Sequence, residues 1–304
     1  VTAYRSPMNP MRGIAYKLLS VAVFMTMASF VKATAPIVPA GEQVFFRSAF
    51  ALPVVIIWLA IRAEFPAALR TPNPMGHLWR GLVGSGGMAF GFLALGLLPL
   101  PEVIAIGLAA PILATIFAAM FLGETIRIYR MIAVGLGLIG VILIISPRLS
   151  EIDPESATKM ETIGAFAALI AAVFAALAQV FVRKLVSTES TGAIVFYFSI
   201  TTTTLSLGTL PFGWVMPDPV TAAMLVATGL LGGAGQILLT MSYRHAETSL
   251  IAPFDYAQMR LALAVGYFVF SELPTGMMPI GVGLITFWGL LILWRGWHLG
   301  VEQV

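Results

Sequence analysis

Cysteine is absent from this 304-residue chain, and charged residues are scarce. Without cysteine, the chain forms no disulfide and offers no thiolate metal site. Only 10% of its residues are charged, whereas a soluble domain averages about 25%. So little charge cannot cover a water-facing surface of this size, and 59% of the residues are hydrophobic. The composition therefore predicts an all-α, polytopic membrane protein.

The motifs of several enzyme classes are also missing. No glycine-rich phosphate loop ending in lysine occurs, which argues against direct coupling to ATP. The chain has no His-Glu-x-x-His zinc motif and no Gly-x-Ser-x-Gly nucleophile elbow. His77, His245 and His298 fall at predicted cytoplasmic helix ends and are expected at the interface. We therefore expect no catalytic residue, no metal, no cofactor and no nucleic-acid partner.

Long apolar stretches occupy most of the sequence. A helix needs about 20 apolar residues to cross the hydrocarbon core of a bilayer. None of the stretches alternates in the manner of barrel strands. The first stretch lacks a small-residue cleavage pattern, so we interpret it as a retained helix. Ten candidate spans are found, at approximately 13–32, 41–62, 76–97, 101–122, 128–146, 162–184, 190–212, 219–243, 249–271 and 277–297.

The positions of lysine and arginine predict the orientation, because these residues favour the cytoplasmic side. With a cytoplasmic N-terminus, twelve of them lie on the cytoplasmic side, Lys17 and Arg80 included. Only Lys32, Arg148 and Lys159 lie on the far side. Ten spans return the C-terminus to the cytoplasm, so both termini are expected there.

The two halves of the chain, 13–146 and 162–297, repeat each other. The segment Gly84-Ser85-Gly86-Gly87 aligns with Gly232-Gly233-Ala234-Gly235, and the same offset aligns Glu124 with Glu272. With small shifts at loops, Gly13 aligns with Gly164, and Lys32 aligns with Arg183. Because each half holds five spans, the second copy must enter the membrane from the opposite side. Inverted repeats of this kind give many secondary transporters one site that is reachable from both sides.

The order of these features resembles the drug/metabolite transporter superfamily, in its EamA-type branch of two five-helix repeats. The resemblance lies in Glu102 to Pro111 followed by Phe121-Leu122-Gly123-Glu124, and in Thr248 to Pro253 followed by Val269-Phe270-Ser271-Glu272. It implies a bacterial inner-membrane protein in which the first, third, fourth, sixth, eighth and ninth helices surround a central cavity. It also implies export of amino acids, aromatic ones among them, or of other metabolites.

Arg260 is the charged residue that lies deepest in a predicted span. It lies about 17 Å into the ninth span, near the bilayer midplane. Charges at this depth usually face the bundle interior, where Arg260 could bind a substrate carboxylate or serve as a structural cation. Tyr256 shares its helix face at a spacing of four. Asp255 could bind a substrate ammonium or lie near the inner headgroups.

Other side chains near mid-depth are candidates for lining the pathway. Each also has an ordinary interpretation as core packing, because methionine and aromatic residues fill helix interfaces readily. Arg47 lies shallower and could snorkel to the outer surface, and a structural role is favoured over contact with a substrate. Glu272 is expected to cap a loop or bind a neighbouring helix. The pathway candidates are Gln179, Gln236, Met25, Met88, Phe90 and Phe174.

Proline and glycine predict the helix geometry of the pathway. Pro111 lies near mid-membrane, where it removes a backbone hydrogen bond and kinks the helix, so it is a candidate gate element. The pairs Gly87 with Gly91 and Gly229 with Gly233 are small-xxx-small patterns, which predict close helix approach.

The sequence therefore predicts a secondary transporter that exports a small-molecule substrate by alternating access, as a monomer or weak homodimer in the lipid bilayer. A passive uniporter fits as well as a proton-coupled carrier, because Asp255 is the only deep candidate for a relay. Two alternatives stay open. An intramembrane enzyme acting on a lipid-like substrate needs two convergent catalytic groups, and a channel needs a continuous polar stripe along one helix.

Overall fold

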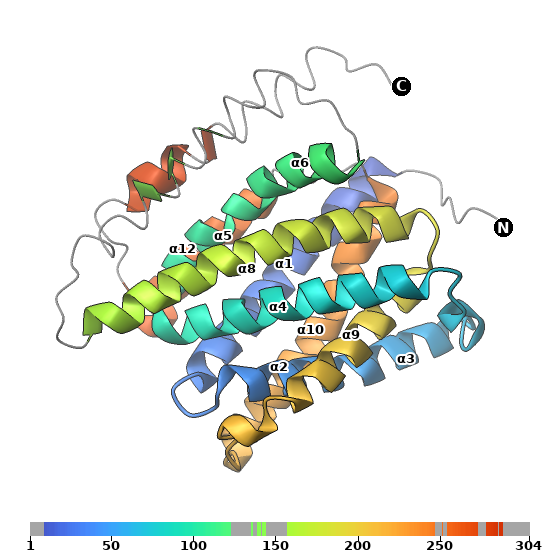
Figure 1. Cartoon of the computed structure of the whole chain (residues 1–304), viewed down its shortest axis with the longest axis horizontal. Helices are drawn as coiled ribbons and strands as arrows, with labels where there is room; N and C mark the ends of the chain where they lie inside the picture. The colour runs from blue at the N-terminus through green and yellow to red at the C-terminus, as the bar shows by residue number, and fades with distance from the viewer. Residues whose placement is uncertain are drawn as a thin grey trace.

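The computed structural model describes residues 9–122, 135, 139–140, 142–143, 157–246, 251, 254–272, 278–284 and 286–287. Within these ranges the chain forms helices and the turns between them, without a strand (Figure 1). The α-helices are α1 (Pro10–Thr34), α2 (Ala40–Ala49), α3 (Ala51–Ile61), α4 (Pro74–Leu97), α5 (Leu100–Gly107), α6 (Ala109–Leu122), α8 (Ala157–Val186), α9 (Thr191–Leu207), α10 (Pro219–His245) and α12 (Asp255–Phe270). Two short 3-10 helices are η1 (Ala67–Leu69) and η2 (Leu210–Phe212).

Three long helices begin with the same two-residue signal. Asn9, Asn73 and Asp218 each precede a proline, and each is the N-cap of its helix, α1, α4 or α10. Their side-chain oxygens accept backbone N–H groups of the first turn, which otherwise lack partners. The proline that follows needs no such partner, and its ring presets the helical φ angle. Local sequence therefore fixes where these three helices start.

Two predicted spans are interrupted just before a proline. The second span consists of α2 and α3, which meet at Phe50, three residues before Pro53. The fourth span consists of α5 and α6, which meet at Leu108, three residues before Pro111. A proline cannot donate to the carbonyl four residues earlier, so the helix is weakest at this point. The kink expected from Pro111 corresponds to this break.

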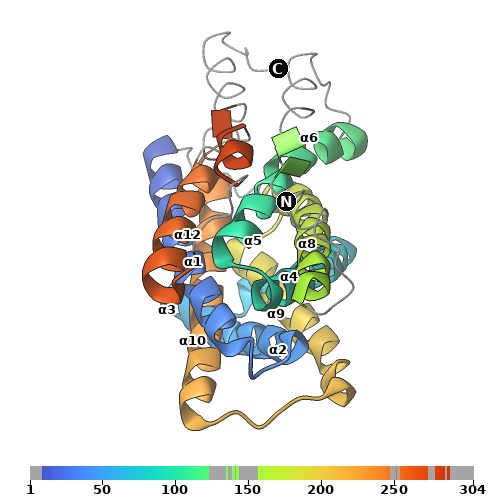
Figure 2. The same ribbon diagram turned by 90° about the vertical axis from the view of Figure 1, so that its left-hand side faces the viewer.

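The helices are grouped around two long pairs. In Figure 1, α4 lies along α8, and the contacts between α1 and α10 are equally extensive. Figure 2 shows α1, α10 and α12 on one side and α4 and α8 on the other, with α5 between them. Helix α5 contacts both α8 and α12, so it links the two sides. The largest buried apolar cluster lies among these helices.

Both long pairs are antiparallel. Gly13, near the start of α1, packs against Ala246, directly after α10, and Gly235 in mid-α10 packs against Phe24 in mid-α1. Gly164, near the start of α8, packs against Leu98, directly after α4. Helices α1 and α4 finish at the same end of the bundle, because Lys32 Nζ lies 2.7 Å from the carbonyl oxygen of Leu98. Consequently α1 and α8, the first helices of the two sequence repeats, run in opposite directions.

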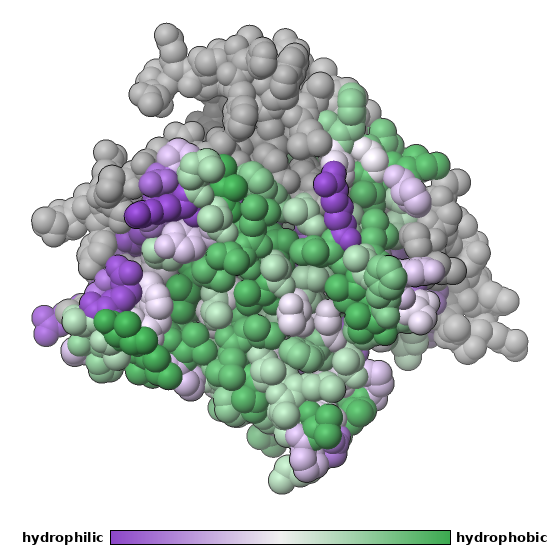
Figure 3. Space-filling model, turned by 180° about the vertical axis from the view of Figure 1, so that it is seen from behind, coloured by the Kyte–Doolittle hydropathy of each residue, from purple (hydrophilic) through white to green (hydrophobic). Residues whose placement is uncertain are grey.

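The described helices suit a bilayer in length and in surface. Five are long and apolar enough to cross a membrane, namely Pro10–Thr34, Ala40–Ile61, Pro74–Leu97, Lys159–Val186 and Pro219–His245. Three more apolar helices are shorter, and the expected spans at 128–146 and 277–297 lie mostly outside the described residues. Figure 3 shows a broad hydrophobic face, with hydrophilic residues mainly toward its edges. Such a face would be unusually large for a soluble protein.

Candidate functional site

Two arginines lie in the interior among α2, α4, α9 and α10. Arg47 of α2 is 2% exposed and Arg80 of α4 is 5% exposed. Their Cζ atoms lie 5.3 Å and 3.9 Å from the ring centroid of Phe198, on α9. Arg47 Nη2 donates to the main-chain oxygen of Gly232 at 3.3 Å. Arg47 therefore does not snorkel to the surface, because the helix packing encloses it. Arg80 is equally enclosed, although the sequence placed it at the cytoplasmic side.

Hydroxyl groups lie on the helices that carry Arg80 and Phe198, α4 and α9. Ser85 Oγ lies 2.8 Å from Thr202 Oγ1, and this contact joins α4 to α9. Within α4, the Ser85 hydroxyl also donates to the carbonyl oxygen of Gly81. Ser199, one residue after Phe198, is fully buried, and its Oγ has no hydrogen-bond partner within the described part of the chain. Polar side chains thus gather at mid-length on α4 and α9, in the middle of an otherwise apolar bundle.

The proposed amino-acid site on α12 has a different environment. Arg260 is exposed, whereas its neighbours Met259 and Ala262 are buried against the bundle. Asp255 forms an ion pair with Lys17 of α1, in which Nζ lies 2.7 Å from Oδ1. Lys17 is 4% exposed, so it is enclosed by the neighbouring helices. Tyr256 belongs to α12, but its side chain lies outside the described part of the structure.

The predicted apolar candidates lie on α1, α4 and α8. Met25 is 2% exposed and belongs to the main apolar cluster, against which Met88 and Phe90 pack. Phe90 and Phe174 are stacked, with ring centroids 6.1 Å apart and planes inclined by 9°. Phe174 also packs against Gly87, and a Cβ added to Gly87 would lie 3.2 Å from the Cβ of Phe174. These residues therefore form part of the α4–α8 interface and the adjoining core.

The remaining candidates differ in burial. Gln236 on α10 is 5% exposed, and its main-chain oxygen accepts the Thr240 hydroxyl at 2.8 Å. Gln179 on α8 and Pro111 on α6 are half-buried. The structure thus brings Met25, Met88 and Phe90 together around one apolar cluster. Among the described residues, no hydrogen bond or ion pair joins the side chain of either glutamine to the Lys17–Asp255 pair.

At the end where α1 finishes, Glu272 links three segments. Its Oε1 lies 2.8 Å from Lys32 Nζ, and its Oε2 accepts the backbone N–H of Leu100, the first residue of α5, at 2.8 Å. Lys32 also donates to the Leu98 carbonyl. The expectation that Glu272 caps a loop or binds a neighbouring helix is confirmed. Helices α1 and α12 are therefore joined by an ion pair at each end of the bundle.

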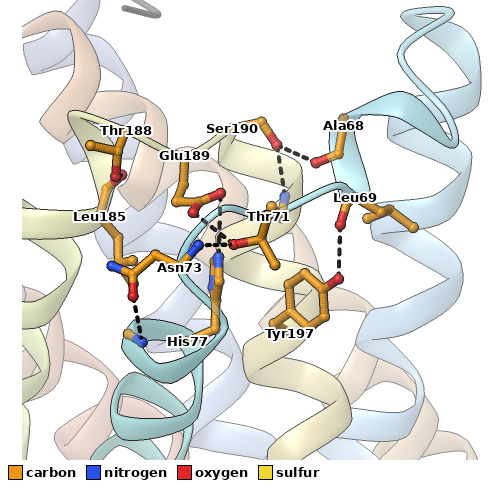
Figure 4. Close-up of polar contacts among 12 residues, drawn as sticks. Ala68, Leu69, Thr71, Asn73, His77, Leu185, Thr188, Glu189, Ser190 and Tyr197 are labelled. Atoms are coloured by element: carbon orange, nitrogen blue, oxygen red, sulfur yellow. Dashed lines mark hydrogen bonds and ion pairs between the residues drawn. The ribbon is translucent and has the colours of Figure 1, made fainter. Parts of the chain in front are cut away.

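A second polar cluster, shown in Figure 4, lies at the end where α4 begins. Glu189 is 2% exposed, and its carboxylate accepts the Thr71 hydroxyl at 2.7 Å and lies 3.5 Å from His77 Nε2. Arg244 Nη2 donates to the main-chain oxygen of Glu189 at 2.6 Å. His77 is 2% exposed, so at this helix end it is enclosed by the cluster. The cluster holds α4, α10 and the turn between α8 and α9 together.

Sequence reasoning missed the interior positions of Lys17, Arg80 and Glu189. Lys17 and Arg80 lie about two turns from the start of their helices and were counted with the cytoplasmic side, and Glu189 was not singled out. Burial of such residues depends on which helices pack beside them, and a count of charges along the chain does not contain that information.

The comparisons with known proteins agree on a transporter family. Residues 11–146 match the EamA-like transporter family. The chain is 29% identical to the pseudopaline exporter of Pseudomonas aeruginosa, over 90% of this chain and 93% of that protein. It is 28% identical to the riboflavin transporter of Rhizobium johnstonii, over 92% and 88% of the two chains.

Two further matches extend this result. The chain is 26% identical to the S-adenosylmethionine uptake transporter of Rickettsia felis, over 77% of this chain and 76% of that protein. A crystal structure with 22% identity shares the fold with a TM-score of 0.68, over 95% of this chain and 98% of the other. The pseudopaline, riboflavin and S-adenosylmethionine proteins are transporters of different small molecules. The match at residues 11–146 and these three relatives together support a transporter of the drug/metabolite transporter superfamily.

Proposed function

We propose that the protein is a secondary transporter that exports small metabolites, and amino acids in particular, across the bacterial inner membrane by alternating access. The bundle would expose one central site first to one side and then to the other, as two inverted repeats tilt against each other. Both termini would lie in the cytoplasm, in agreement with the concentration of lysine and arginine at the end where α1 begins.

One observation carries this proposal, namely that contacts between the halves recur when the halves are exchanged. Gly13 packs against Ala246, where an added Cβ would collide with the alanine side chain. In the repeat alignment Gly13 corresponds to Gly164, and Ala246 corresponds to Leu98. An added Cβ on Gly164 would lie 2.8 Å from Leu98 Cγ, so the corresponding pair is also in close contact. Together with the opposite directions of α1 and α8, this supports a two-fold relation with its axis in the membrane plane.

Substrate recognition would use the exposed charge on α12. Arg260 forms no ion pair with a described residue, so its guanidinium would be available to a carboxylate. Asp255 would bind the ammonium only by exchanging it for Lys17, because that lysine already neutralises the carboxylate. Such an exchange would couple substrate arrival to separation of α1 from α12. Export is the proposed direction, although the relatives named above include uptake transporters.

Counterflow in proteoliposomes tests this function. Purified protein is reconstituted without ATP, and vesicles are preloaded with one unlabelled amino acid from a panel that includes phenylalanine, tryptophan, methionine and glutamate. External labelled amino acid should accumulate transiently only in preloaded vesicles that contain the protein. Labelled substrate that merely equilibrates would indicate a channel, and absence of flux for every member would refute amino-acid transport.

A variant comparison then tests the proposed site. Arg260→Ala should raise the KM for an amino acid about tenfold or more, because a charged hydrogen bond contributes about 1.5–3 kcal/mol. Lys184→Gln removes an exposed positive charge near the end of α8 and serves as the matched control. Equal KM values for Arg260→Ala and the parent would exclude Arg260 from substrate binding.

A further inference from the structure

The interior arginines Arg47 and Arg80 lack a negative partner. The ion pairs within the described ranges use other cations, and no carboxylate lies within 4.0 Å of either guanidinium there. The Nε and Nη1 atoms of both residues are buried and have no hydrogen-bond partner within those same ranges. Desolvating a cation without a partner costs several kcal/mol, and here two such cations repel each other. A buried arrangement of this kind calls for an anion.

Two glycines accommodate the guanidiniums. An added Cβ on Gly232 would lie 2.8 Å from Arg47 Nε, and an added Cβ on Gly84 would collide with Arg80 Nη1. Gly84 and Gly232 are the first residues of the two aligned repeat motifs, so each repeat places one glycine beneath one arginine. The guanidinium of Arg47, from α2, and that of Arg80, from α4, therefore lie against equivalent glycines of α10 and α4.

The surroundings suit a planar organic anion. The ring centroid of Phe198 lies within 5.3 Å of the Cζ atoms of both arginines. Both guanidinium groups therefore lie against one apolar ring. The buried Ser199 hydroxyl has no hydrogen-bond partner in the described structure, and it follows Phe198 on α9. Guanidinium groups bind carboxylates through two parallel hydrogen bonds, and each arginine retains unused donors for that geometry.

We propose that Arg47 and Arg80 form an anion-binding site that receives the carboxylate of a small transported metabolite. This inference rests on the proposed transport function, because the site is enclosed and a ligand reaches it only when the helices around it separate. It assigns the substrate class as a carboxylate and gives the pathway a second carboxylate contact, among α2, α4, α9 and α10, in addition to the one proposed at Arg260 on α12. A neutral analogue of the same shape would leave both guanidiniums unneutralised.

Thermal unfolding of the purified protein in detergent tests the site directly. Three matched pairs are compared, namely acetate with acetamide, benzoate with benzamide and glutamate with glutamine. Sodium chloride is added to each amide so that ionic strength is equal and chloride serves as the inorganic anion. At least one carboxylate should raise the Tm by about 2 °C or more above its amide, because a ligand bound only to the folded state stabilises it. Equal Tm values within all three pairs would overturn the proposal.

Variants locate the effect. Arg47→Gln and Arg80→Gln should each abolish the difference between carboxylate and amide, whereas Arg62→Gln, at an exposed arginine, should preserve it. If a glutamine variant does not fold, Arg47→Lys and Arg80→Lys retain the charge but lose two-point binding, so a reduced difference is expected. A full difference in the lysine variants, or in folded glutamine variants, would show that the carboxylate binds elsewhere.

A transport measurement separates this inference from the proposed function. In proteoliposomes, uptake of the carboxylate that gave the largest Tm shift should fall about tenfold or more in Arg47→Gln and Arg80→Gln. If the wild-type protein transports nothing in the panel, the transport function fails while the Tm comparison still decides the anion site. If the wild-type protein transports that carboxylate and both variants match it, the anion site fails while the transport function stands.

Discussion

Lys17 of α1 and Asp255 of α12 form an ion pair with Nζ 2.7 Å from Oδ1, and Lys17 is almost completely buried. The pair joins the first helix of one sequence half to the ninth predicted span. Tyr243 lies beside it, with its ring centroid 5.8 Å from Lys17 Nζ. Because the lysine is desolvated, the partner carboxylate is what keeps its charge in the interior.

Removal of either charge should therefore destabilise the protein. Breaking a buried ion pair costs about 3–5 kcal/mol, and the 22% exposure of the Asp255 side chain places the expected loss at the lower end. Lys17→Met and Asp255→Leu should each lower the free energy of unfolding, while the two substitutions combined should recover part of the loss. Thermal unfolding of the four proteins measures this, and additive single losses would show that the pair does not interact.

Gly229 on α10 provides a test of helix packing. An added Cβ would collide with Phe50 Cβ and lie 2.6 Å from the carbonyl oxygen of Phe46. Neither atom is the end of a flexible side chain, so neither can move away easily. Gly229→Ala should destabilise the protein by about 1–3 kcal/mol, the usual cost of overpacking. Gly107→Ala is the matched control, because an added Cβ there meets nothing within 4 Å. Equal unfolding temperatures for the two variants would contradict the close approach of α2 and α10.

Much of the fold could be predicted because its signals are local. The apolar stretches predicted the five described helices that are long enough to cross a membrane, and Pro111 predicted the interruption at Leu108. Glycine spacing correctly predicted the close helix contacts at Gly87 and Gly229. Each of these signals affects the structure of residues close to it in the sequence, so the position of the structural feature can be predicted from the sequence.

The candidate site was harder to predict because it depends on contacts between distant segments. Arg80 and Lys17 were assigned to the cytoplasmic side from their distance to a helix end, yet both are enclosed by neighbouring helices. Arg260 was selected for its depth, yet its side chain is exposed on α12. Depth along a helix can be counted from the sequence, but the face that packs inward is set by all the partners of that helix.

Ser271 ends α12 in a conformation that favours glycine. Its φ angle is +54°, and the following N–H, of Glu272, donates to the carbonyl oxygen of Gly266 at 2.8 Å. The left-handed region costs a non-glycine residue roughly 1–2 kcal/mol, and the aligned residue of the first repeat is Gly123. Ser271→Gly should therefore raise the free energy of unfolding by about 0.5–1 kcal/mol, as measured by thermal unfolding. Ser271→Ala retains the strain, and a gain of equal size in that variant would exclude this explanation.

Asp218 should contribute a pH-dependent term at the start of α10. The Thr221 hydroxyl and backbone N–H groups donate to its carboxylate and lower its pKa below the ordinary value. A group whose pKa is lower in the folded state stabilises that state above its unfolded pKa of about 3.9. This contribution is lost as the pH falls through the folded pKa.

Unfolding temperatures measured between about pH 3 and pH 7 test this assignment. The difference between the parent and Asp218→Asn should stay constant above about pH 5 and shrink as the pH falls below about 4. Thr221→Val removes the hydroxyl donor, so its own pH dependence in this range should be weaker than that of the parent. A constant difference across the whole pH range would show that Asp218 does not titrate in this way.

The Lys32–Glu272 ion pair should restrain the end of the bundle where α1 finishes. Because the chain contains no cysteine, one introduced thiol reports the accessibility of one site. Val31 is fully buried next to Lys32, so Val31→Cys should react slowly with a maleimide in the parent. Adding Glu272→Gln removes the charge that binds Lys32 and should accelerate the reaction about tenfold, which corresponds to about 1.4 kcal/mol less for opening.

Ala176→Cys, fully buried in α8, should stay unreactive in the same background, because only the end of the bundle where α1 finishes opens. Faster labelling at both positions would indicate global unfolding, and unchanged labelling at Val31→Cys would show that the ion pair does not hold this end closed.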